Sequence, residues 1–237
     1  MRYLSDPFAD ELRKCAVSPS ARLHFALVLL ESGRDERAAK VLEGLYKRQP
    51  KDVVVLNNLA IALQRLGELQ RAAELLDGAL AVDPKVLSTW INLANLALAQ
   101  HTSARALECS ERALALAPES AKANLVHGRV LQYQNRHAEA ITAFERARTA
   151  DPREFDALEL LASSWKALGE PARAKASLAA LAEERPFDAR AHLALARACL
   201  ELGQRVQAEH EFATARSLAP QDPEVAVLGR DLAASVR

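Results

Sequence analysis

The sequence predicts an all-α protein, a solenoid of antiparallel helix pairs, and three periodic features predict it. Prolines recur every 34 residues without a gap, at Pro50, Pro84, Pro118, Pro152, Pro186 and Pro220. Between two prolines lie two amphipathic segments, and the residue between these segments is of a type that tolerates a left-handed backbone. Small residues recur at fixed places in both segments. A constant period of this length is the signature of a stacked-repeat architecture.

The recurring small residues constrain how the two helices of a pair pack. With the residue three after each proline counted as position 1, position 8 is small in every unit: Ala26, Ala60, Ala94, Gly128, Ala162 and Ala196. Position 20 is alanine throughout: Ala38, Ala72, Ala106, Ala140, Ala174 and Ala208. Two helices that carry small residues at matched places can approach closely and cross, with larger apolar side chains at positions 7 and 24 around the contact.

Position 15 predicts where the first helix of each pair ends. It is occupied by Gly33, Gly67, His101, Asn135, Gly169 and Gly203. Glycine adopts positive φ without steric cost, and Asn and His are enriched there among the other residues. We therefore expect a left-handed residue at all six places, which satisfies the last carbonyl groups of the first helix. The proline at position 32 then ends the second helix.

These residues resemble the tetratricopeptide repeat (TPR) family, with its small residue at 8, turn glycine near 15, alanine at 20 and proline at 32. The resemblance covers about residues 19–220 and implies a right-handed superhelix of helix pairs whose first helices line a concave groove. The family's tryptophan at position 4 occurs once, as Trp90; the other units carry Arg22, Leu56, Asn124, Leu158 and His192.

The two ends of the chain are predicted to cap this array. Residues 1–18 contain a helix start at Asp6-Pro7 and an apolar stripe (Phe8, Leu12, Cys15), which we interpret as a capping helix at about 7–16. The alternative is that this helix folds into the groove over Leu23, Leu27 and Leu30 as a competitor. Six repeats follow over 19–222, and residues 223–237 form a C-terminal capping helix.

Polar residues mark the boundary between the third and fourth repeats. Ser110, Asn124 and His127 occupy positions that are apolar in most other units. Buried polar groups must find partners, so a satisfied local network is the first interpretation. A hinge between two three-repeat halves is the alternative.

Composition excludes several classes of function. Lys+Arg and Asp+Glu both number 31, and the balance holds in both halves of the chain, so no basic nucleic-acid-binding face is expected. Three cysteines far apart predict buried, inert thiols, with neither a disulfide framework nor a zinc site. The chain shows neither a signal sequence nor an apolar run long enough to span a membrane. We expect a cytoplasmic protein, unless a targeting segment has been removed.

The sequence contains none of the common catalytic motifs: GxSxG, HExxH, GxGxxG and a Walker loop are all missing, and the six histidines form no i,i+4 pair. The sequence therefore predicts a protein that is not an enzyme and that needs neither cofactor nor metal.

The expected groove supplies the candidate binding residues. It is apolar with amides in repeats one to three and charged, with a basic excess, in repeats four to six. The candidates are Leu27, Asn57, Asn58, Ile61, Asn92 and Asn95, followed by Lys122, Arg129, Tyr133, Arg190 and Arg197. Asparagine amides donate and accept, so they can hold the backbone of an extended peptide.

The predicted function is a non-catalytic adaptor or scaffold that binds a partner peptide or helix in its concave groove. An apolar stretch of the partner would contact repeats one to three, and acidic residues would contact repeats four to six. One alternative is a self-assembling scaffold, which would make the protein a homo-oligomer. Another is a separate regulatory subunit of an enzyme complex.

Overall fold

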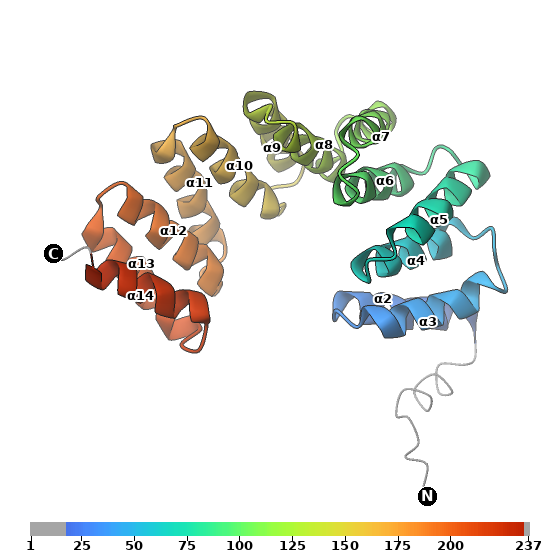
Figure 1. Cartoon of the computed structure of the whole chain (residues 1–237), viewed down its shortest axis with the longest axis horizontal. Helices are drawn as coiled ribbons and strands as arrows, with labels where there is room; N and C mark the ends of the chain where they lie inside the picture. Colours follow the sequence, from blue (N-terminus) through green and yellow to red (C-terminus); the bar gives the residue numbers. More distant parts are fainter. Residues whose placement is uncertain (1–17, 235–237) are drawn as a thin grey trace, which may run out of the picture. The chain divides into compact units, whose positions relative to one another are not determined.

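The computed structural model describes residues 18–234, which fold into 13 helices and contain no strand (Figure 1). The predicted helix at about 7–16 lies outside the described residues. The first helices of the six repeats are α2 (Pro19–Glu31), α4 (Val53–Arg65), α6 (Leu87–Ala99), α8 (Ala121–Tyr133), α10 (Asp156–Ala167) and α12 (Ala189–Glu201). The second helices are α3 (Asp35–Tyr46), α5 (Leu69–Val82), α7 (Ser103–Leu116), α9 (His137–Ala150), α11 (Pro171–Glu184) and α13 (Arg205–Leu218), and α14 (Pro223–Ala234) follows.

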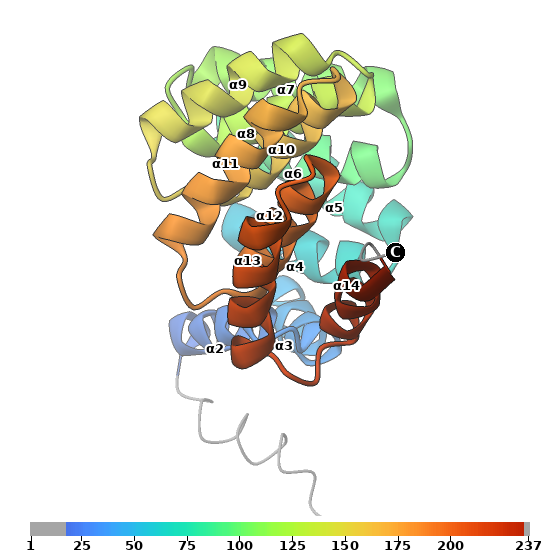
Figure 2. The same ribbon diagram turned by 90° about the vertical axis from the view of Figure 1, so that its left-hand side faces the viewer.

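The helices fall into two compact units that divide between Ala117 and Pro118. We call them the N-terminal unit, with α2 to α7, and the C-terminal unit, with α8 to α14. Within each unit every first helix packs against its own second helix, and every second helix packs against the next first helix (Figures 1 and 2). The all-α architecture of antiparallel helix pairs is therefore confirmed.

The small residues lie where the helices of a pair cross. All six alanines at position 20 are buried, between 0% and 5% exposed, and so are all six residues at position 8. In the fourth repeat the small residue is Gly128, which leaves room for the ring of Phe144 on α9. The period of small residues thus marks the core of each pair, as the sequence predicted.

The left-handed residue at position 15 is confirmed in all six repeats. The φ angles are +57° at His101, +60° at Asn135 and between +69° and +83° at the four glycines. At each of these ends the N–H of the residue at position 16 donates to the carbonyl oxygen at position 11, over 2.8–2.9 Å. This 6→1 bond is the Schellman motif, and it fixes the turn between the two helices of a pair.

Two glycines of the second repeat therefore respond oppositely to the same substitution. Gly67→Ala is expected to destabilise the protein by about 1 kcal/mol, because alanine is strained at φ +83° although no atom lies within 4 Å of its Cβ. Gly78→Ala, inside α5 and equally free of neighbours, is expected to stabilise it by about 0.5–1 kcal/mol. Urea denaturation followed by circular dichroism measures both, and shifts of the same sign would contradict the assignment.

Side chains at the helix starts supply the first N–H groups with acceptors. Asp52 Oδ1 accepts from Val54 and Val55 over 2.9 and 3.2 Å, and Asp222 Oδ1 accepts from Glu224 over 2.8 Å. Each such cap contributes about 1 kcal/mol to its helix. These caps fix where α4 and α14 begin.

The polar residues near the boundary of the two units have partners. Ser110 is fully buried and donates to the carbonyl oxygen of Leu107 over 2.9 Å. Asn124, 2% exposed, donates to the carbonyl oxygens of Pro118 and Ser120 over 2.7 and 3.0 Å. The interpretation of a satisfied local network is confirmed for these two residues, and the hinge stays a prediction.

The helix α14 closes the C-terminal unit against α12 and α13. Its apolar side, Val225, Leu228 and Leu232, is buried, at 2–6% exposed. Gly229 lets the helix lie close to Phe212 of α13, since a Cβ at this position would be 3.0 Å from the ring. With α14 packed in this way, Glu224 in its first turn lies next to Arg197 of α12.

Candidate functional site on the first helices

In the N-terminal unit the predicted residues lie on consecutive first helices. Leu27 is on α2, Asn57, Asn58 and Ile61 are on α4, and Asn92 and Asn95 are on α6. All are partly exposed except Asn57, which is buried at 5%. Direct contacts join α2 to α4 and α4 to α6, so these side chains stand on neighbouring helices of the unit.

Asn57 connects two repeats. Its Nδ2 donates to Val53 O and to Thr89 Oγ1, both over 2.8 Å, and its Oδ1 accepts from Asn92 Nδ2 over 2.9 Å. Thr89 on α6 is fully buried. Sequence reasoning missed Thr89, although it stands at position 3, where the other repeats carry only alanine or valine. The hydrogen bonds of Asn57 thus connect the second and third repeats, and one of them also orients Asn92.

The neighbouring asparagine also uses its amide within the protein. Asn58 Nδ2 donates to Val54 O over 2.8 Å. Both N–H groups of Asn57 are therefore engaged inside the N-terminal unit, and Asn58 and Asn92 each donate one hydrogen bond there. A peptide backbone would meet the amides of Asn58 and Asn92 beside Ile61, and it would have to exchange existing bonds only to reach the donors of Asn57.

In the C-terminal unit the predicted residues are exposed and belong to two helices. Lys122, Arg129 and Tyr133 lie on α8, whereas Arg190 and Arg197 lie on α12. The two arginines on α12 line a pocket of about 790 Å³, and the three residues on α8 lie outside it. The structure thus brings together only part of the predicted basic set.

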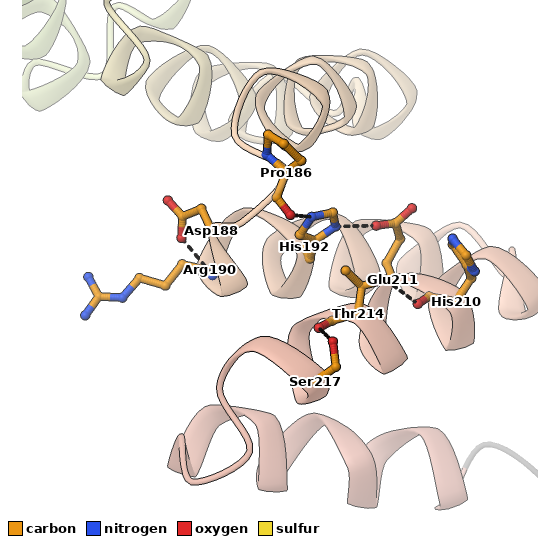
Figure 3. A network of polar contacts seen from close by, with 8 residues as sticks. All are labelled: Pro186, Asp188, Arg190, His192, His210, Glu211, Thr214 and Ser217. Carbon is orange, nitrogen blue, oxygen red and sulfur yellow. Dashed lines mark hydrogen bonds and ion pairs between the residues drawn. The ribbon is translucent and has the colours of Figure 1, made fainter.

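This pocket, which we call the α12 pocket, has an apolar floor and a charged rim. The floor is formed by Leu178 of α11 and Leu193, Ala194 and Ala198 of α12, and Pro223 of α14 closes one side. Arg190 lines the rim, and its backbone N–H donates to Asp188 Oδ1 over 3.0 Å, which caps the start of α12. Figure 3 shows its side chain extending away from the ribbon of α12.

Ion pairs occupy the other cations of the rim. Arg197 Nη1 lies 3.0 Å from Glu224 Oε2 of α14, and Lys166 Nζ lies 2.5 Å from Glu201 Oε1. All four side chains are 44–62% exposed. Exposed pairs of this kind contribute little, about 0–1 kcal/mol, so a partner can exchange them at low cost.

Sequence reasoning missed most of the acids of this rim. The sequence placed Glu159 on this surface, but it did not place Glu201, Asp222 and Glu224 there. All four acids line the same pocket as Lys166, Arg190 and Arg197, so its charges are nearly balanced. The basic excess expected from the first helices alone disappears because α14 and the end of α12 add carboxylates. Charge balance favours a partner that is itself mixed in charge.

The described part of the chain shows no groups arranged for metal or thiol catalysis. Residues 18–234 hold no cluster of His, Cys, Asp or Glu suited to a metal ion. Cys109 and Cys199 are free and buried, and burial raises the pKa of both thiols, which disfavours the nucleophilic thiolate. No helix among these residues has the length and apolar character required to cross a bilayer.

Solved structures share this fold at low sequence identity. A thermophilic TPR protein of Thermus thermophilus is 22% identical with a TM-score of 0.72, and covers 77% of this chain and 100% of its own. The pilF protein of Pseudomonas aeruginosa is 20% identical with a TM-score of 0.69, over 90% of this chain and 97% of its own. YrrB, described as a TPR protein with an unusual peptide-binding site, is 20% identical with a TM-score of 0.57, over 81% and 99%.

At these identities the likeness shows the fold alone, the superhelical solenoid of helix pairs. No curated protein sequence matches the chain. The family model described as tetratricopeptide repeat matches residues 29–96, 131–196 and 166–231, which is more than half of the sequence. The chain therefore belongs to the tetratricopeptide repeat family, whose fold supports protein–protein interaction scaffolds in general and is typically non-catalytic.

Proposed function

We propose that the protein is a non-catalytic binding module that holds a segment of a partner protein against its first helices. The observation that carries this proposal is the α12 pocket, which consecutive first helices and α14 form within one unit. Its volume of about 790 Å³ lies in the range of pockets that bury a ligand of several side chains.

The pocket supplies two kinds of contact that peptide recognition uses: apolar burial and charged hydrogen-bonding groups. An apolar side chain of the partner that is buried on Leu178, Leu193 and Ala198 of the floor stabilises the complex by about 25 cal/mol per Å² removed from water. The rim then sets orientation, since Arg190 can receive a carboxylate and Glu159 a cation. Affinity comes from a few anchors, and the surrounding contacts exclude water.

The surface of the N-terminal unit would act by the same principle. Leu27 and Ile61 offer apolar contact area, and the oxygens of Asn58 and Asn92 can accept from a peptide backbone. Lys122, Arg129 and Tyr133 remain part of the proposal as exposed contacts on α8. In this proposal Asn57 positions Asn92 and does not touch the partner.

Peptide display against the purified chain tests the proposal. Twelve-residue peptides selected on the wild-type protein are labelled, and fluorescence anisotropy measures their affinity for two variants with the same substitution. Ala194→Arg fills the floor of the α12 pocket and is expected to weaken binding more than tenfold. Ala176→Arg, exposed on α11 outside the pocket, is the matched control and should leave binding unchanged.

Selected peptides that bind both variants with wild-type affinity would show that the α12 pocket is not the site. Circular dichroism shows whether Ala194→Arg stays folded, and Arg190→Ala provides a milder second variant on the rim. If Ala194→Arg does not stay folded, an unchanged affinity for Arg190→Ala would reject the proposed site.

A further inference from the structure

A side chain donates to the backbone carbonyl of the proline that precedes most repeats. Trp90 Nε1 donates to Pro84 O over 2.8 Å, and Asn124 Nδ2 donates to Pro118 O over 2.7 Å. His192 Nε2 lies 3.1 Å from Pro186 O, as Figure 3 shows. These three donors all stand at position 4.

At Pro152 the donor is a different side chain. Position 4 of the fifth repeat is Leu158, which has no polar group, and Arg148 Nη1 from α9 donates to Pro152 O instead. Before the third, fourth, fifth and sixth repeats, a side-chain nitrogen of the protein therefore lies within hydrogen-bond distance of the proline carbonyl oxygen.

The second repeat is the exception. Its position 4 is Leu56, and no side-chain or backbone donor within residues 18–234 forms a hydrogen bond with Pro50 O. A pocket of about 970 Å³ opens at this place, between α3 and α5, with Pro50 at its edge and Leu56 and Leu59 in its floor. We call it the Pro50 pocket. It shares no residue with the α12 pocket or with the candidate residues on the first helices.

The sequence explains why this pocket is open. Leu56 is smaller than the tryptophan that stands at the same position one repeat later. Gly78 on α5 adds no side chain to the wall, and Val82 beside it is 44% exposed. The indole of Trp90 shows which group fits the same junction in the next repeat: a flat aromatic ring with an N–H directed at the proline carbonyl.

We propose that the Pro50 pocket receives a tryptophan side chain from a partner polypeptide, with acidic residues next to that tryptophan. The apolar floor takes the ring, and Pro50 O accepts from the indole N–H. Lys47 and Lys51 flank Pro50 on the rim and form no ion pair among residues 18–234. On the opposite side Arg71 is already bonded to Glu43 over 2.8 Å, and Glu74 of α5 is the other acid of the lining. The two lysines supply the charge that selects acidic neighbours.

Titration with short peptides tests the pocket directly. The probe is the amidated peptide acetyl-Glu-Trp-Glu, and two-dimensional amide NMR of the whole chain reports where it binds. We expect saturable shifts at Tyr46, Lys47 and Gly78. The same peptide with 1-methyltryptophan lacks the N–H donor and should bind about three- to tenfold more weakly, since one net hydrogen bond is lost. Acetyl-Lys-Trp-Lys should also bind more weakly.

Two glycines at the same position of consecutive repeats supply matched variants. Gly78→Leu fills the Pro50 pocket and should abolish the shifts, whereas Gly44→Leu lies on α3 outside the pocket lining and should preserve them. If the peptide causes no shift at Gly78, or if Gly78→Leu binds as well as Gly44→Leu, the proposal is wrong.

A second measurement needs no peptide. Leu56→Trp should fill the pocket from within and raise the melting temperature relative to Leu158→Trp, because Arg148 already occupies the carbonyl at the latter junction. Leu56→Trp should also abolish binding of the probe. A Leu56→Trp variant no more stable than Leu158→Trp would show that the pocket does not accept an indole.

Discussion

Replacing Gly128 with alanine is expected to destabilise the C-terminal unit by about 1–3 kcal/mol, the cost typical of overpacking a close-packed core. An added Cβ would lie 2.4 Å from Cε1 and 2.6 Å from Cδ1 of Phe144. Phe144 is fully buried within the core, so its ring can shift only by displacing other core side chains. The measurement is urea denaturation followed by Trp165 fluorescence, since this tryptophan belongs to the C-terminal unit.

A second substitution should reverse this loss. Phe144→Leu alone removes buried ring atoms and destabilises the unit by leaving a cavity. Combined with Gly128→Ala, it recreates the alanine and leucine pair of the second repeat, where Ala60 and Leu76 are both 1% exposed. The double variant should therefore be more stable than the sum of the two single changes predicts. Additive effects would show that the two positions do not compete for the same space.

The parts of the fold that the sequence predicted are those set by local backbone and by side-chain size. Position 15 illustrates this: glycine, His101 and Asn135 meet one requirement, a positive φ, which can be recognised from residue type alone. The small residues at positions 8 and 20 are recognised the same way, because close helix crossings exclude larger side chains.

The parts that the sequence did not predict depend on neighbours from other repeats. Asn57 and Asn58 are adjacent and chemically identical, yet Asn57 is buried against Thr89 while Asn58 is partly exposed. The 34-residue period predicts the same face of α4 for both, and their different burial depends on where α6 packs, which the sequence of α4 does not give. The acids around Arg197 escaped prediction for the same reason, because Glu224 comes from the first turn of α14.

The second large loss of stability is expected from a substitution in the asparagine pair on α4. Asn57→Leu is expected to destabilise the N-terminal unit by about 1–3 kcal/mol, because the fully buried Thr89 hydroxyl loses its donor and Asn92 loses its acceptor. Asn58→Leu is the matched control and should change stability by less than about 0.5 kcal/mol, as is usual for partly exposed positions away from a network. Urea denaturation followed by circular dichroism compares the two.

A third substitution separates the lost hydrogen bonds from the change in shape. Adding Thr89→Val to Asn57→Leu removes the unpaired hydroxyl as well, and replacing both partners by apolar groups is nearly neutral when the shape is kept. The double variant should therefore recover much of the loss of Asn57→Leu. If it stays as unstable as Asn57→Leu, then packing of the leucine causes the loss and the bond between Asn57 and Thr89 does not hold the two repeats together. If Asn58→Leu costs as much as Asn57→Leu, the distinction between a positioning and a contact asparagine is wrong.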